Sequence, residues 1–316
     1  MFMKKNILTL SAFVALSGAC LFGQQDKLLT HFIYDKMTIN PASTGLSKGI
    51  SATSVYRNQW DKINGAPNSV LLNVEGSVPM VPGGLGMSFY HDAIGKMRQN
   101  SLLINYSFPY RIQGLGTIAA GIGVGMVNIG FDPKWIPPVT LNDPLLPGVN
   151  GGTNFDVNFG VMLKGDQNYY FGVSMAHLTK AAIKNVNYSN ARNLFIMAGY
   201  THAVTAPTAN GLPGKRIDAQ MVARTEFVKF STELNVRYLH DKDLFYGGLT
   251  YRITDGIGLM GGFNPPQIPN FTVGYSYDLT LNGLRDISNG SHEFLLKYVY
   301  FLPPPPVQKS KHPRWL

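Results

Sequence analysis

Apolar and polar residues alternate along most of the chain with a period of two. Over residues 153–164 the apolar positions are Phe155, Val157, Phe159, Val161 and Leu163, and the intervening ones include Asn154, Asp156, Asn158, Gly160 and Lys164. Successive side chains of a strand point to opposite faces, so one face of this segment meets an apolar environment and the other meets water. Elsewhere the apolar faces are rich in Tyr and Phe. The pattern is typical of transmembrane β-barrel strands.

Alternation and turn signals together predict fourteen strands. We place them near residues 49–60, 68–79, 84–95, 99–111, 116–131, 153–164, 169–178, 192–204, 217–227, 230–240, 243–253, 256–264, 270–280 and 291–301. Barrels of the bacterial outer membrane have even strand numbers. We therefore expect an all-β fold, a transmembrane antiparallel β-barrel of about fourteen strands in the outer membrane, formed by residues 49–301.

Residues 1–23 have the features of a secretory signal peptide. Two lysines precede an apolar run over 7–22, which is shorter than the ~20 residues of a membrane-spanning helix, and polar residues follow from Gln24. Cleavage near residue 23 would remove Cys20, the only cysteine. Lipid attachment at Cys20 is the alternative, although Ser17 stands where lipoprotein signals normally have leucine.

Composition agrees with a membrane barrel. Charged residues make up only 14% of the chain, against ~25% in soluble domains. The formal charge is +9, and it remains positive without the two leader lysines. Lysines and arginines are scattered rather than arranged in a stripe, so nucleic-acid binding is not expected. A positive surface would suit the phosphate-bearing lipids of an outer membrane.

Motifs of enzymes and cofactor sites are missing from the sequence. The seven histidines show no pair at metal-ligand spacing, and no Gly-x-Ser-x-Gly motif occurs. The run Gly121, Gly123, Gly125 lacks the remaining residues of a nucleotide-binding loop. We expect no metal, no cofactor and no enzymatic activity.

Strand parity predicts the orientation of the barrel. If the first strand rises outward, the two longest connections, 132–152 and 179–191, lie on the cell exterior and both mature termini are periplasmic. Long exterior loops and short periplasmic turns are the usual asymmetry. The connection 205–216 is an exception, because parity makes it periplasmic although it is long.

Charged residues at alternate positions identify the inward face of several strands. A charge on the lipid face costs ~2 to 4 kcal/mol at mid-membrane, so charged side chains are expected to face the lumen. Two interpretations remain open, an ion or solute path and a mesh of salt bridges that holds the wall. The predicted lumen-lining residues are Asp156, Lys164, Arg224, Glu226, Glu233, Arg237, Arg252, Asp278, Glu293 and Lys297.

The strand 116–131 has glycines at its inward positions. Glycine within a strand often marks a close approach by other backbone, so either residues 24–48 or an inward-folded exterior loop is expected to pack there. The alternative is that the glycines allow the wall to curve. Residues 24–48 are accordingly interpreted as an N-terminal periplasmic or plug segment.

The chain ends in a Pro-rich basic tail, residues 302–316. Four consecutive prolines from Pro303 cannot continue a sheet and favour a stiff extended segment. We expect this tail in the periplasm, either as a docking peptide or as a solvated stub.

Several short motifs follow one another along the chain: Gln25-Asp26, Ile39-Asn40-Pro41-Ala42, Tyr56-Arg57-Asn58-Gln59-Trp60, Gly65-Ala66-Pro67, Tyr275-Ser276-Tyr277-Asp278 and Gly290-Ser291-His292-Glu293. In these motifs and their order the chain resembles the PorP/SprF-type outer-membrane proteins of the type IX secretion system of Bacteroidota. The chain departs from the family at Ser43-Thr44-Gly45, where an aromatic residue and a small turn are usual, and in its tail.

The resemblance implies a non-enzymatic barrel of the secretion and gliding machinery. It would assist export or surface attachment of adhesins with C-terminal sorting domains. In the periplasm it would contact a peptidoglycan-binding lipoprotein and components of the secretion ring. Arg57, Asn58 and Trp60 match the family, and a structural role is expected for them ahead of direct cargo contact. The candidates for partner contact are Asn40, Pro41, Arg57, Trp60, Trp135, Tyr188, Lys309, Lys311, Arg314 and Trp315.

Two other functions compete with this hypothesis. A passive or substrate-selective pore would use the charged lumen. A surface hydrolase would use His292, Glu293 or another constellation that the sequence does not reveal. Conductance and turnover measurements separate these alternatives.

Overall fold

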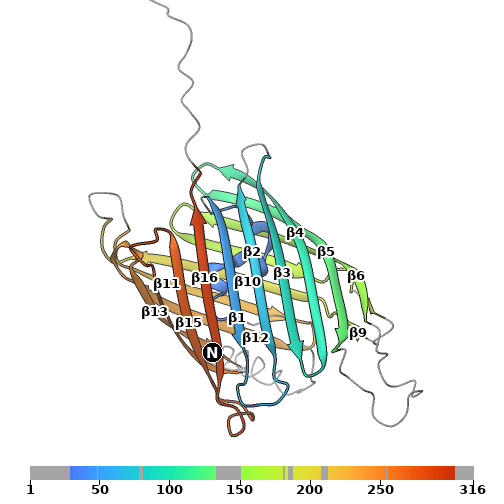
Figure 1. The fold of residues 1–316 in the computed structure, drawn as a ribbon. Coiled ribbons are helices and arrows are strands. Elements are labelled where there is room, and N and C mark those ends of the chain that lie inside the picture. The colour runs from blue at the N-terminus through green and yellow to red at the C-terminus, as the bar shows by residue number, and fades with distance from the viewer. Residues whose placement is uncertain are drawn as a thin grey trace, which may run out of the picture.

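The structure is a computed structural model in which the chain forms one closed antiparallel barrel (Figure 1). It describes residues 29–47, 49–77, 81–132, 151–180, 182–183, 188–207, 213–253 and 255–302. The fourteen strands of the wall are β1 (Ile50–Asn58), β2 (Asn68–Ser77), β3 (Gly84–Ile94), β4 (Met97–Ile112), β5 (Gly116–Phe131), β6 (Gly152–Gly165), β7 (Tyr169–Ala176), β10 (Asn193–Ala203), β11 (Arg216–Thr225), β12 (Phe230–Leu239), β13 (Phe245–Arg252), β14 (Gly256–Phe263), β15 (Phe271–Thr280) and β16 (Ser291–Tyr300). The predicted fold class is confirmed.

The barrel closes where its first strand meets its last. β1 pairs with β16 over its whole length, from Ile50 opposite Tyr300 to Asn58 opposite His292. Every other wall strand pairs with the wall strands that precede and follow it in sequence. The connection from β7 to β10 contains a separate two-stranded ribbon, β8 (Ala182–Ile183) and β9 (Tyr188–Ser189). Closure leaves no unpaired sheet edge, which is the condition for a sheet to cross a lipid bilayer.

Alternation along the strands separates an apolar exterior from a polar interior. In β12 the side chains of Glu233, Asn235 and Arg237 are buried, whereas Leu234 and Val236 are exposed on the outer surface. The outward positions of β5 are likewise apolar, as at Ile122 and Met126. The outer surface therefore suits hydrocarbon, and the charges lie inside.

The two ends of the barrel differ in their connections. We call the end where β1 begins and β16 finishes the terminal end, and the opposite one the distal end. The distal connections include residues 59–67, 132–151, 177–192 and 281–290, and the terminal ones include 113–115, 166–168 and 204–215. The terminal connection from β12 to β13 contains a 3-10 turn, η5 (Asp241–Asp243).

Residues 29–47 lie within the barrel, and we call them the plug (the darkest blue ribbon in Figure 1). They form three short 3-10 turns, η1 (Phe32–Tyr34), η2 (Lys36–Thr38) and η3 (Pro41–Ser43). Phe32 and Ile33 pack in a buried apolar cluster with Phe195 and Met197 of β10. Leu29 packs in a second cluster with residues of β1, β2, β3 and β16.

No helix in the described part of the chain is long and apolar enough to cross a membrane.

Candidate functional site: the plugged lumen

The plug is bound at the distal end by two carboxylates of the wall. The Glu293 carboxylate accepts hydrogen bonds from the backbone N–H groups of Thr30 (2.9 Å) and His31 (2.7 Å), and it lies 2.8 Å from the His31 Nδ1 atom. The Thr30 hydroxyl contacts both carboxylate oxygens of Asp278 at 3.0 Å. Both carboxylates lie close to the distal ends of their strands, so this contact fixes the start of the plug in the distal half of the lumen.

Two arginines of the wall neutralise these carboxylates. Arg57 lies 2.9 Å from Glu293 and 2.7 Å from Asp278 through its two terminal nitrogens. Arg252 bonds to Asp278 (2.6 Å) and Glu233 (2.8 Å), and it also donates to the Thr30 hydroxyl at 2.6 Å. Paired and hydrogen-bonded charges of this kind tolerate burial, whereas a single member left alone does not. We call this group the latch; it consists of Thr30, His31, Arg57, Glu233, Arg252, Asp278 and Glu293.

The middle of the plug rests on glycines of the wall. Asn40 donates to the backbone carbonyls of Val161 (3.1 Å) and Val173 (3.4 Å), and it accepts from the Ala42 amide at 2.9 Å. A Cβ atom at Gly121 would collide with the backbone of the plug at Ala42. A Cβ at Gly160 would likewise collide with the Asn40 side chain. These glycines give the room in which η3 approaches β5 and β6.

The plug is also bound at its terminal end. The Gly45 amide donates to Glu75 (3.0 Å), and Lys164 donates to the Leu46 carbonyl (2.8 Å). Lys297 donates to the Tyr34 carbonyl at 2.5 Å. Asp35 is buried and accepts hydrogen bonds from Thr38 and Asn73. Polar bonds to the wall therefore hold the plug along the length of the lumen.

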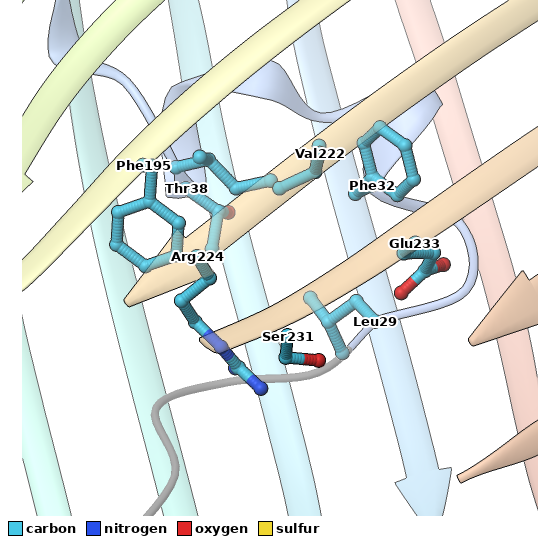
Figure 2. Close-up of a pocket in the computed structure, with 9 residues that line it drawn as sticks. Leu29, Phe32, Thr38, Phe195, Val222, Arg224, Ser231 and Glu233 are labelled. Carbon is cyan, nitrogen blue, oxygen red and sulfur yellow. The ribbon is translucent and has the colours of Figure 1, made fainter. Parts of the chain in front are cut away.

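Cavities of very different size lie beside the plug among the described residues. The larger, about 480 Å³, lies at the terminal end between the plug and the wall, and we call it the vestibule. The ends of the long connection 204–215 line it, through residues that include Thr205 and Pro213. The smaller cavity measures about 30 Å³ and lies among Leu29, Phe32 and Arg224 (Figure 2). The smaller volume accommodates roughly one or two waters.

Lys36 and Asp35 are ionisable groups of the plug whose pKa values are shifted. Burial lowers the pKa of Lys36 to about 8, and the nearby cations Arg237 and Lys297 act in the same direction. Burial raises the pKa of Asp35, and hydrogen bonds from Thr38 and Asn73 oppose that change. The environment of Lys36 is therefore positive as well as poorly hydrated.

The structure brings four of the predicted lumen-lining residues, Glu233, Arg252, Asp278 and Glu293, together in the latch. Arg237 pairs with Asp218 (2.6 Å), and its guanidinium lies 4.5 Å from the centre of the Tyr34 ring. Lys164 and Lys297 line the vestibule. The remaining three lie toward the distal end: Asp156 is 2.7 Å from His177 Nδ1, and Arg224 and Glu226 line a small recess.

The predicted partner-contact residues occupy different environments. Asn40, Pro41 and Arg57 are buried in the interior, where they hold the plug and have no surface to offer a partner. Trp60 lies in the distal connection 59–67, and its amide donates to the Ser291 hydroxyl at 3.1 Å. The other candidates lie outside the residues whose side chains the structure describes: Trp135, Tyr188, Lys309, Lys311, Arg314 and Trp315.

His292 and Glu293 point to opposite faces of β16. The Nδ1 atom of His292 lies 2.8 Å from the Tyr275 hydroxyl on the outer surface, while Glu293 is fully buried in the latch. They cannot act on one substrate. In the described part of the chain, no three His, Cys, Asp or Glu side chains converge as a metal site would require.

Solved outer-membrane proteins share the barrel architecture. The toluene transporter TbuX of Ralstonia pickettii is 11% identical with a TM-score of 0.50, and the match covers 84% of this chain and 93% of TbuX. Omp33 of Acinetobacter baumannii is 8% identical with a TM-score of 0.47, and the match covers 81% of this chain and 100% of Omp33. At these identities the likeness to TbuX shows the fold alone. No curated protein matches the chain.

The family comparison is more specific. The model of the family described as type IX secretion system membrane protein PorP/SprF matches residues 21–298, which include the plug and nearly the whole wall. Barrel fold and family together identify an integral protein of the outer membrane. The chain belongs to the PorP/SprF family of type IX secretion system membrane proteins.

Proposed function

We propose that the protein is a non-enzymatic component of the type IX secretion and gliding machinery that works as a protein-binding scaffold. It would assist export or surface attachment of adhesins with C-terminal sorting domains. It would also contact a peptidoglycan-binding lipoprotein and components of the secretion ring in the periplasm. Membership of the family supports a role in the secretion machinery. The plugged lumen supports the role of a scaffold.

The single observation that carries the scaffold role is the plug bound at both ends. Glu293 holds its start through two backbone amides, and Glu75 holds its finish through the Gly45 amide. A lumen held in this way leaves the outer rims, the connections and the vestibule as the surfaces through which the barrel acts. Binding of partner proteins at these rims needs no reaction and no passage through the lumen.

The proposed orientation places the distal end on the cell exterior. The long distal connections would then meet secreted adhesins, and the terminal end would meet periplasmic partners. The described chain leaves the barrel at Leu302 on the terminal end, which agrees with a periplasmic tail. Leu29 lies in the distal half, and residues 24–28 are outside the described part, so a periplasmic N-terminus stays a prediction.

A substrate-selective pore is the second candidate, and the vestibule favours it. A cavity of about 480 Å³ opens toward the terminal end, where a solute could enter. Passage would require the plug to leave its latch. Planar-bilayer recordings of the purified protein distinguish the candidates, because the scaffold predicts a closed barrel and the pore predicts steady conductance.

Purification from native membranes under gentle detergent, followed by mass spectrometry, tests the proposed function. We expect components of the secretion machinery to accompany the barrel, and a deletion strain to lose surface display of particular adhesins. Recovery of the barrel alone together with normal adhesin display would contradict the proposal.

A further inference from the structure

Cations outnumber carboxylates in the lining of the vestibule. Five cationic side chains face two carboxylates, an excess of three cations. The cations come from the plug and from four strands of the wall: Lys36, Lys164, Arg216, Arg237 and Lys297. The carboxylates are Glu75 and Asp218. A concave site with one dominant sign of charge attracts ligands of the opposite sign.

The two arginines of this lining are neutralised by carboxylates of the wall. Arg237 contacts Asp218 through two nitrogens, at 2.6 and 2.9 Å. Arg216 pairs with Asp243, which lies in η5 behind the lining. These pairs orient the guanidinium groups but leave little net charge for a ligand. The excess positive charge therefore comes from the lysines.

Lys36 and Lys297 form no close ion pair of this kind, although Glu75 and Asp35 attract Lys297 at longer range and Asp218 attracts Lys36. Lys36 donates to the Ile33 carbonyl at 3.4 Å and Lys297 to the Tyr34 carbonyl at 2.5 Å. Among the described residues, no carboxylate lies within ion-pair distance of either ammonium group. An ammonium group has three donors, so both lysines keep donors for a ligand.

The nearby carboxylates are occupied by other groups. Glu75 accepts a hydrogen bond from the Gly45 amide, and Asp35 accepts from Thr38 and Asn73. Burial lowers the pKa of Lys36 to about 8, and the nearby cations Arg237 and Lys297 lower it further, which agrees with this distribution of charge. A carboxylate placed beside Lys36 would oppose that effect.

The remaining lining is suited to a peptide. Tyr34, Tyr170 and Pro213 give flat apolar surfaces between the cations, and the Lys36 ammonium lies 4.6 Å from the centre of the Tyr170 ring. The volume of about 480 Å³ falls in the range of about 300–1,000 Å³ that is typical of pockets for small ligands. Only a short extended segment fits a cavity of this size.

We propose that the vestibule binds an extended acidic peptide segment of a partner protein, which enters from the terminal end and places carboxylates on Lys36 and Lys297. The inference deepens the proposed scaffold function and rests on it for the existence of a partner on that side of the membrane. Binding itself is a property of the barrel alone. It can therefore fail while the scaffold function stands, or hold while the scaffold function fails.

Fluorescence anisotropy with fluorescein-labelled hexaglutamate tests the proposal on the purified full-length protein in detergent micelles. Replacement of either lysine, by Lys36→Gln or Lys297→Gln, should weaken binding about two- to fivefold, the range expected for loss of one partly exposed ion pair. The matched control is Lys62→Gln, which removes the same charge from an exposed position in the distal connection 59–67. This control should bind like the wild type, and labelled hexalysine should not bind.

Three results would overturn the proposal. The first is equal affinity of the wild type and both vestibule variants. The second is the same loss of affinity in Lys62→Gln, which would mean that net charge alone drives binding. The third is displacement of the peptide by inorganic phosphate at a phosphate concentration equal to the peptide concentration that half-saturates the barrel. Such a result would indicate a site for small anions. If Lys36→Gln does not fold, two other variants test the proposal. Lys297→Gln should weaken binding, and Lys36→Arg should retain it because the positive charge is preserved.

Discussion

Arg57 and Glu293 lie opposite each other on β1 and β16, at the seam that closes the barrel, and their side chains form a buried ion pair at 2.9 Å. The same carboxylate binds the backbone amides of Thr30 and His31. One side chain thus takes part in both closure of the wall and attachment of the plug. Loosening the plug at this point is therefore expected to affect the stability of the seam as well.

Glu293→Gln should release the start of the plug and destabilise the barrel. An amide leaves Arg57 and the two plug amides with weaker acceptors, and breaking a buried ion pair typically costs about 3 to 5 kcal/mol. Thermal unfolding followed by heat-modifiable migration measures the loss. Asp286→Asn, in an exposed position of the distal connection 281–290, is the matched control and should unfold like the wild type. Equal unfolding temperatures for both variants would contradict the contribution of the latch to the stability of the barrel.

Gly121→Ala should disturb the packing between the plug and the wall. Its Cβ would collide with the backbone of Ala42, and overpacking of this kind costs about 1 to 3 kcal/mol. Gly247→Ala serves as the control, because a Cβ there meets only one atom, at 4.0 Å. Chemical denaturation of the two purified variants should show a lower midpoint for Gly121→Ala. Identical midpoints would show that the glycine is not required by the plug.

The lowered pKa of Lys36 gives the stability of the plugged barrel a defined pH dependence. The folded pKa is about 8 and the ordinary value is 10.5, so between these pH values the unfolded chain binds more protons. Folding stability should therefore rise with pH across this window, relative to a Lys36→Met variant that lacks the group. Burial is the main cause of the lowered pKa; the cations Arg237, Lys297 and Lys164 add to it, and Asp218 opposes it. Parallel pH profiles for the two proteins would contradict the expected shift.

Cysteine labelling tests the proposed orientation. Lys62→Cys lies in a distal connection and Gln113→Cys in the terminal connection 113–115, and both positions are exposed. In intact cells a membrane-impermeant maleimide should label the first and not the second. The reverse pattern would place the terminal end on the cell exterior and the vestibule with it.

Much of the wall could be predicted because each strand carries its own signal. Burial of one face forces alternation, and the cost of a charge in lipid fixes which face is inward, so Glu233 and Glu293 could be assigned to the lumen from sequence. The predicted strands agree with the structure to within a few residues. The strand 99–111, for example, extends over Met97–Ile112.

The plug could not be derived in the same way. Its 3-10 turns are three residues long and have no periodicity, and their partners lie far away in sequence, as Thr30 and Glu293 do. The glycines of β5 predicted either a close neighbour or wall curvature, and the structure places Pro41 and Ala42 against Gly121. The vestibule arises only after closure, because it joins the plug to strands from both halves of the chain. Its lysines carry no local signal for a shared site.

Planar-bilayer conductance of the full-length protein tests the central claim most directly, since that claim is a lumen closed by residues 29–47. The wild-type barrel should insert without steady conductance, and Glu293→Gln should open intermittently as the plug leaves its latch. A stable open state of the wild type, unchanged by Glu293→Gln, would contradict the account.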